Sequence, residues 1–191
     1  MSELRDDAPL TAAKSGDAAG RAAAALPDAQ GDTLIGRSVT INRPAAELYA
    51  YWRNLSHLPT FMDNVVSIDM IDERRSHWVV RAPGGRTVEW DAVITEDKEG
   101  ELIAWASTGD ADVPNSGWVT FRDACARGTV VTATILYDPP GGVIGKIIAK
   151  MFQREPAIQA RRDLRRFKQL MEAGEVATAA WTRQQLEEER D

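Results

Sequence analysis

Between about residue 65 and residue 137, apolar and polar side chains alternate in short runs that turn residues separate. In TVEWDAVI, for example, Val88, Trp90, Ala92 and Ile94 fall on one side of an extended chain, and the residues between them fall on the other. A period of two predicts strands with one buried face and one hydrated face. The predicted strands are VVSIDMI, SHWVVRA, RTVEWDAVITE, ELIAWAS, SGWVTFRD and GTVVTATILYD, and their close spacing predicts antiparallel hairpins.

Helical spacing appears before this block of strands. The segment DTLIGRSVTI has the composition of a first strand, and Pro44 then marks the start of a helix. Four apolar residues of that helix share one face, at the spacing i, i+3, i+4 and i+7: Leu48, Tyr51, Trp52 and Leu55. A second short helix follows, and it tolerates Pro59 because this proline lies in the first turn, where no amide donor is needed.

A long amphipathic helix is predicted after the strands. The residues DPPGG end the sheet, and helical spacing of apolar residues then runs from about residue 143 to residue 173. Pro156 kinks or splits this helix because it removes a backbone donor and clashes with the preceding turn. Gly174 is placed to end it.

The order strand, two short helices, six strands and long helix predicts one α+β domain over residues 32–174. Residues 1–31 are rich in Ala, Gly, Asp and Ser with few large apolar side chains, so we expect a disordered leader there. Residues 175–191 form a polar, charged tail.

The composition of the chain limits its expected cellular location and binding partners. The chain of 191 residues carries 23 Lys and Arg against 29 Asp and Glu, so we expect no nucleic-acid partner and interpret the basic run RRDLRRFK as a hydrated helix face. Its single cysteine, Cys125, favours a reducing, cytoplasmic location. No stretch reaches the roughly 18 consecutive apolar residues of a membrane-spanning helix, so we expect no transmembrane segment.

Several separated blocks resemble one protein family in the same order. They are PAAELYAYWRNLSHLPTFMDNVVSIDMIDERRSHWVV, GRTVEWDAVITE, IAWAS, PNSGWVTF, YDPPGGVIGKIIAKMF and DLRRFKQLMEAG. Over residues 32–174 the chain is similar to the bacterial polyketide cyclase/dehydrase-like branch of the START-like (SRPBCC, helix-grip) superfamily, which also contains coenzyme Q-binding and lipid-transfer proteins. The resemblance implies the helix-grip fold, in which a curved seven-stranded antiparallel sheet wraps around a long C-terminal helix and encloses an apolar cavity.

Aromatic and methionine side chains are the candidates for lining such a cavity. The chain has six tryptophans, and a tryptophan suits a cavity wall as well as an ordinary core because it combines an apolar body with one ring N–H donor. The residues predicted to line the cavity are Trp52, Phe61, Met62, Trp78, Trp90, Trp105, Ile148, Met151 and Phe152.

Candidates for catalysis are few. The polar candidates for a reaction in the cavity are His57, Tyr137 and Arg81, whereas strict alternation turns Glu89 and Asp91 away from Trp90 into solvent. The other histidine, His77, is expected to point out of its strand. Neither histidine has Cys or carboxylate neighbours at metal-ligand spacing, and no nucleophile or phosphate-loop motif is present, so we expect neither a metal nor a cofactor.

These observations favour binding or transport of a lipophilic small molecule, such as a lipid, a quinone or a polyketide-like aromatic. One alternative is a cyclase or dehydratase that moves protons with polar groups inside the cavity, which requires at least one titratable side chain there. The other alternative is a macromolecular interaction module, which an exposed apolar patch or a cavity too small for any ligand would favour.

Overall fold

The computed structural model describes residues 33–82, 85–137 and 156–176. The elements in chain order are β1 (Thr33–Ile41), α2 (Ala45–Arg53), the 3-10 helix η1 (Leu55–Thr60), β2 (Val65–Met70), β3 (Arg75–Ala82), β4 (Arg86–Lys98), β5 (Leu102–Thr108), β6 (Asn115–Asp123), the 3-10 helix η2 (Cys125–Arg127), β7 (Thr129–Tyr137) and α4 (Pro156–Ala173). The predicted order of elements is confirmed. The leader predicted for residues 1–31, most of the polar tail and the part of the long helix before Pro156 lie outside the described residues.

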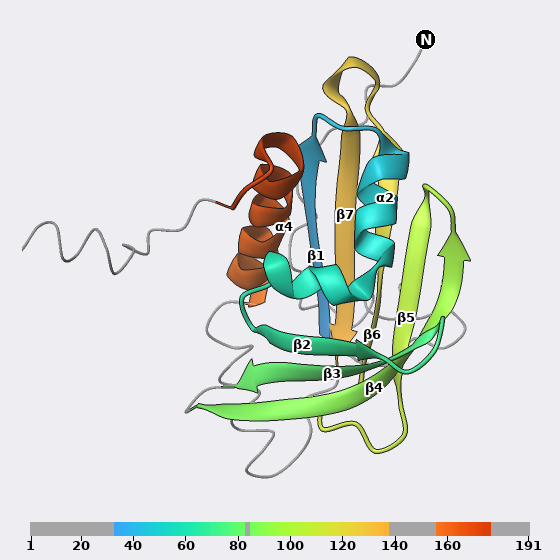
Figure 1. The fold of residues 1–191 in the computed structure, drawn as a ribbon, viewed down its shortest axis with the longest axis vertical. Coiled ribbons are helices and arrows are strands. Elements are labelled where there is room, and N and C mark those ends of the chain that lie inside the picture. Colours follow the sequence, from blue (N-terminus) through green and yellow to red (C-terminus); the bar gives the residue numbers. More distant parts are fainter. Residues whose placement is uncertain (1–32, 83–84, 138–155, 177–191) are drawn as a thin grey trace, which may run out of the picture.

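All seven strands form one antiparallel sheet in the order β1-β7-β6-β5-β4-β3-β2. The first strand therefore pairs with the last one, and β1 and β2 form the two edges. Figure 1 shows β1, β7, β6 and β5 running along the long axis while β2 and β3 cross below them, with β4 arcing between the two directions. A register shift between Ile94 and Glu96 interrupts the pairing of β4 with β5, and such irregularities bend a strand.

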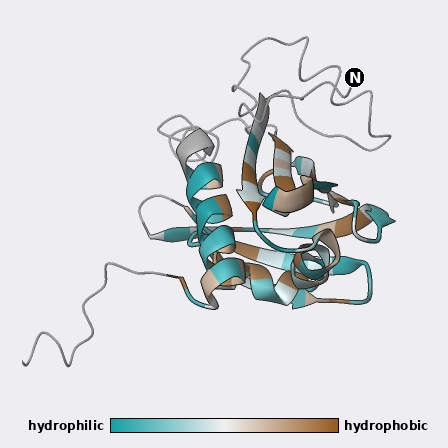
Figure 2. Ribbon diagram, turned by 90° about the horizontal axis from the view of Figure 1, so that it is seen from above, coloured by the Kyte–Doolittle hydropathy of each residue, from teal (hydrophilic) through white to brown (hydrophobic). Residues whose placement is uncertain are grey.

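Both α-helices lie on the concave side of this curled sheet (Figure 1). Helix α4 packs beside β1, where Lys168 Nζ donates a hydrogen bond of 2.8 Å to the carbonyl of Thr40. Gly174 ends the helix as predicted, because its φ of 80° favours glycine and its N–H bonds the Leu170 carbonyl at 2.8 Å. Figure 2 shows hydrophobic and hydrophilic positions alternating along α4, as an amphipathic helix requires.

The main core lies between the helices and the sheet. Leu48 and Trp52 of α2 are buried there, as the helical spacing predicted, together with Phe121 from β6 and Phe167 from α4. A smaller buried cluster gathers near the other end of β3 and β4. Among the described residues, no helix is both long enough and apolar enough to cross a membrane.

Candidate ligand-binding cavity

A cavity of about 130 Å³ lies between the sheet, the short helices and α4. Its wall receives side chains from α2, η1, α4 and all five strands from β3 to β7. Most of these side chains are aliphatic or aromatic, and small ones such as Ala92 and Ala133 leave the central strands open toward the space. The curvature of the sheet and the small residues at its centre together keep the cavity unfilled.

The structure brings five of the predicted lining residues together around this cavity. They are Trp52, Met62, Trp78, Trp90 and Trp105. Phe61, one residue before Met62, is not among the lining residues and packs against Trp52 and Phe167 at ring-centroid distances of 5.4 and 4.9 Å. Ile148, Met151 and Phe152 lie outside the described residues. That the five lining residues contact a ligand stays a prediction.

Two tryptophans form one part of the wall. Trp78 of β3 and Trp90 of β4 stand directly opposite each other, and their rings stack at 6.1 Å with an angle of 11° between the planes. The indole N–H of Trp78 donates a 2.9 Å hydrogen bond to Ser76 Oγ, which fixes the ring. The period-two pattern of β4 therefore turned Trp90 inward as predicted.

Trp105 forms another part of the wall, and its position depends on a glycine. A Cβ atom on Gly117 of the neighbouring strand β6 would lie 2.6 Å from Cζ2 of the Trp105 ring and 2.5 Å from the Thr134 carbonyl oxygen. Any side chain larger than hydrogen would displace the indole, so Gly117 makes room for this ring.

Among the described residues, three polar ones line the cavity. Ser76 and Asn115 are buried, and Asn115 Nδ2 donates to the Val113 carbonyl at 2.8 Å. The third is Asp163 on α4, whose Oδ1 accepts a 2.8 Å hydrogen bond from Gln159 Nε2. Burial raises the pKa of Asp163 to about 7, against the lowering effects of the Gln159 hydrogen bond and the Arg162 charge. The carboxyl group therefore changes between its protonated and ionised forms near neutral pH.

Sequence reasoning missed Asp163 because it lies inside RRDLRRFK, a run interpreted as a hydrated helix face. A helical signal was nonetheless present. Asp163 follows Ala160 by three positions and directly precedes Leu164, and both of these apolar residues also line the cavity. An acidic residue at the border of an apolar stripe is therefore a candidate for the cavity wall.

None of the three predicted catalytic candidates lines the cavity. His57 is exposed on η1, where its ring lies 4.8 Å from that of Tyr51 and its Nε2 is 3.0 Å from Asn54 Nδ2. Arg81 is exposed on β3. Tyr137 is buried in the smaller apolar cluster near the end of the sheet. The structure does not bring these three residues together.

The outer face of the sheet carries the remaining histidine. His77 Nδ1 lies 2.7 Å from Asp91 Oδ1, and His77 Nε2 lies 3.6 Å from Glu89 Oε2. The hydrogen bond with Asp91, followed by the nearby negative charges, raises the pKa of His77. The predicted outward orientation of Glu89 and Asp91 is confirmed, since both are exposed. Within the described ranges, no three His, Cys, Asp or Glu side chains gather as a metal site would require.

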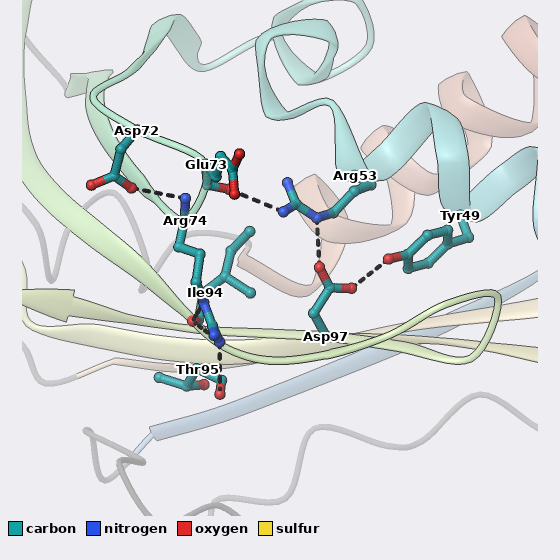
Figure 3. A network of polar contacts seen from close by, with 8 residues as sticks. All are labelled: Tyr49, Arg53, Asp72, Glu73, Arg74, Ile94, Thr95 and Asp97. Carbon is teal, nitrogen blue, oxygen red and sulfur yellow. Dashed lines mark hydrogen bonds and ion pairs between the residues drawn. The ribbon is translucent and has the colours of Figure 1, made fainter.

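A polar network joins α2 to β4, one of the strands that line the cavity (Figure 3). Arg53 Nε lies 2.6 Å from Asp97 Oδ2, and the Tyr49 hydroxyl donates a hydrogen bond to the same carboxylate. Burial, and then the Asp97 contact, raises the pKa of Tyr49 to about 12, so this hydroxyl stays protonated and keeps donating. Nearby, Arg74 Nη2 donates to the carbonyl of Ile94, a lining residue, at 2.8 Å. The network holds β4 against α2.

Known proteins and solved structures are similar to this chain over most of its length. An uncharacterized 17.2 kDa protein from Streptomyces lincolnensis is 29% identical over 148 residues, which are 77% of this chain and 95% of that protein. A crystal structure from Deinococcus radiodurans is 41% identical, with a TM-score of 0.61, over 74% of this chain and 98% of that one.

A crystal structure of an aromatase/cyclase from Streptomyces sp. R1128 has a TM-score of 0.59 over 75% of this chain and 98% of that one. At 14% identity this likeness concerns the fold alone. The helix-grip fold that the resemblance implied is confirmed. A family model described as polyketide cyclase / dehydrase and lipid transport matches residues 33–172, and the chain therefore belongs to this family.

Proposed function

We propose that this protein binds a lipophilic small molecule, such as a lipid, a quinone or a polyketide-like aromatic, in the cavity between its sheet and α4. The observation that carries this proposal is an unfilled space of about 130 Å³ with an almost wholly apolar wall. Protein interiors are normally close-packed, and an empty apolar cavity lowers stability. A space that costs stability is best explained by a ligand that fills it.

The aromatic wall supports the same proposal. Trp78, Trp90 and Trp105 line the cavity and remain only half-buried in the protein alone. A ligand that covers their exposed surfaces removes further apolar area from water, which favours binding. Ser76, Asn115 and Asp163 supply the small number of polar contacts that orient a ligand in such pockets.

The test begins with the natively purified protein. Native mass spectrometry should reveal a bound lipophilic molecule, and toluene or p-xylene should change the intrinsic tryptophan fluorescence on binding. Trp78→Ala should weaken that binding about two- to tenfold, because one aromatic contact surface is lost. Trp118→Ala is the matched control, since Trp118 is half-buried on the same sheet but does not line the cavity. Absence of a co-purified ligand together with no binding of either probe would contradict the proposal.

Asp163 favours a second candidate function, that of a cyclase or dehydratase. Its carboxyl group lines the cavity and has a pKa of about 7, so it is able to accept or donate a proton near neutral pH. In a dehydration it would take the C–H proton beside a carbonyl group and deliver this proton to the hydroxyl of the neighbouring carbon, which then leaves as water. Loss of water from a small β-hydroxy ketone, followed by mass spectrometry in wild type and Asp163→Asn, tests this candidate. Equal rates in the two proteins would exclude Asp163 from the reaction.

A further inference from the structure

We infer that the cavity selects a compact, uncharged aromatic molecule of one ring, whose carbonyl oxygen accepts a hydrogen bond from the carboxyl group of Asp163. This inference deepens the proposed function and rests on it. Three observations carry it, namely the size of the cavity, the unpartnered hydrogen-bond donors on its described wall, and the low charge around Asp163.

The size of the cavity limits the ligand. Its volume is about 130 Å³. For comparison, an apolar cavity of about 150 Å³ in another protein holds a single benzene ring. A long acyl chain or a skeleton of several rings exceeds such a space, whereas one ring with a short substituent fits it. The tryptophans on the wall add contact surfaces suited to an aromatic ring.

Several hydrogen-bond donors of the cavity wall have no acceptor among the described residues. In residues 33–82, 85–137 and 156–176, no group accepts a hydrogen bond from the indole N–H of Trp52, Trp90 or Trp105, and all three line the cavity. Ser76 Oγ accepts from Trp78, which leaves the serine proton available to a ligand. Unpaired donors that are removed from water lower stability. A ligand that brings an acceptor oxygen offsets this cost, whereas one that brings only donors does not.

Within the part of the chain that the structure describes, few charges act on Asp163. On its own helix the charge of Arg162 acts on it, while Arg166 is paired with Asp63. On β1, the strand beside α4, Arg37 Nη1 donates a 2.6 Å hydrogen bond to the Gly36 carbonyl.

The lining residues from α2, η1 and β3 to β7 have no acidic or basic side chains. Burial therefore dominates and raises the pKa of Asp163 to about 7. Below that pH the group is a neutral acid. Its Oδ1 accepts from Gln159, and the proton on the other oxygen is available to donate.

Three probes of nearly equal shape separate the possibilities: acetophenone carries a carbonyl, ethylbenzene carries no polar group, and α-methylbenzylamine carries a cation. Calorimetric titration at pH 6 should show acetophenone binding about three- to tenfold more tightly than ethylbenzene, the range expected for one hydrogen bond. At pH 8 this preference should shrink because Asp163 ionises and loses its proton. Asp163→Asn keeps a donor and should retain the preference at both pH values. Asp163→Leu should lose the preference while it still binds ethylbenzene, and Trp118→Phe should behave as wild type.

Three results would overturn the inference. The first is equal affinity for acetophenone and ethylbenzene at pH 6, and the second is an undiminished preference in Asp163→Leu. The third is tighter binding of the amine at pH 8 than of the ketone at pH 6, which would assign the cavity to a cation held by the Asp163 carboxylate. If toluene or p-xylene binds in a Trp78-dependent way while acetophenone gains nothing from Asp163, only this inference fails. If no probe binds at all, the proposed function fails with it.

Discussion

Two regions of the interior are rich in aromatic rings, and they pack in different ways. Around Phe167, the rings of Trp52 and Phe61 lie 5.1 and 4.9 Å away, and all three side chains are at most 3% exposed. Around the cavity, Trp78 and Trp90 stack on each other but stay half-buried beside an unfilled space. Similar residue types thus form a filled core in one region and an open wall in the other.

This difference indicates which aromatic residues contribute mainly to folding stability and which contribute mainly to ligand binding. In the filled region each ring is surrounded by protein, so its removal leaves a cavity that costs free energy. In the open region part of each ring faces space that a ligand can occupy, so its removal affects binding more than folding. Trp52 belongs to both regions, because it packs against Phe167 and also lines the cavity.

The largest expected effect on stability comes from the filled region. Phe167 is fully buried, and its ring packs against those of Tyr51 and Trp52 from α2 and of Phe61 just after η1. Phe167→Ala should lower the free energy of unfolding by about 3–5 kcal/mol, the usual range for removing a buried phenylalanine. Urea denaturation measures this loss. A loss below about 1 kcal/mol would mean that this region is not the tightly packed one.

Asp163 gives the next largest effect on stability, and the size of this effect depends on pH. The folded pKa of about 7 exceeds the ordinary value of 3.8, so between these pH values the folded protein keeps a proton that the unfolded chain releases. Stability should therefore fall as the pH rises from about 4 to about 7 and then level off. At pH 8, Asp163→Asn should be more stable than wild type by on the order of 3 kcal/mol. The full pKa shift corresponds to roughly 4 kcal/mol, and the partial exposure of Asp163 lowers this value.

The measurement is urea denaturation of both proteins at pH 5 and pH 8. The stability difference between Asp163→Asn and wild type should be clearly larger at pH 8, because only there is the wild-type carboxyl ionised in the folded state. A difference that does not change with pH would contradict the burial of this carboxyl group.

A tryptophan of the open wall should matter less to stability than Phe167. Trp78→Ala removes a half-buried ring next to existing empty space, so we expect a loss of about 1–2 kcal/mol from the apolar area that becomes exposed. Thermal unfolding of Trp78→Ala and Phe167→Ala under the same conditions compares the two losses of stability directly. Equal losses in the two variants would remove the distinction between the filled and the open region.

The smallest effect is expected on the outer face of the sheet. The contact with Asp91 raises the pKa of His77, so the pair stabilises the protein below the ordinary pKa of histidine and this contribution is lost as the pH rises through the raised value. Because these side chains are well exposed, His77→Ala should cost less than about 1 kcal/mol at pH 6, and high salt should reduce the cost further. Urea denaturation at pH 6 and pH 9 measures it, and a loss that is as large at pH 9 would contradict the ion pair.

The sequence predicted the order of elements and the strand faces because the period of two is regular, as in β4, where Trp90 and Ala92 both line the cavity. It did not separate Phe61 from Met62, since adjacent residues in a short helix and turn give no period that decides which one reaches the space. His57 and Arg81 were chosen by residue type, and only the folded geometry shows that both are exposed. The cavity itself depends on sheet curvature, which no residue pattern specified.

The most direct test of the central claim is to fill the cavity and measure binding of a lipophilic probe. Ala92 lies at the centre of β4 and lines the space, so Ala92→Leu places additional methyl groups inside it. We predict that Ala92→Leu remains folded, as its urea denaturation curve should show, and that it no longer binds toluene. Unchanged toluene binding by this variant would show that the molecule does not bind in the space between the sheet and α4.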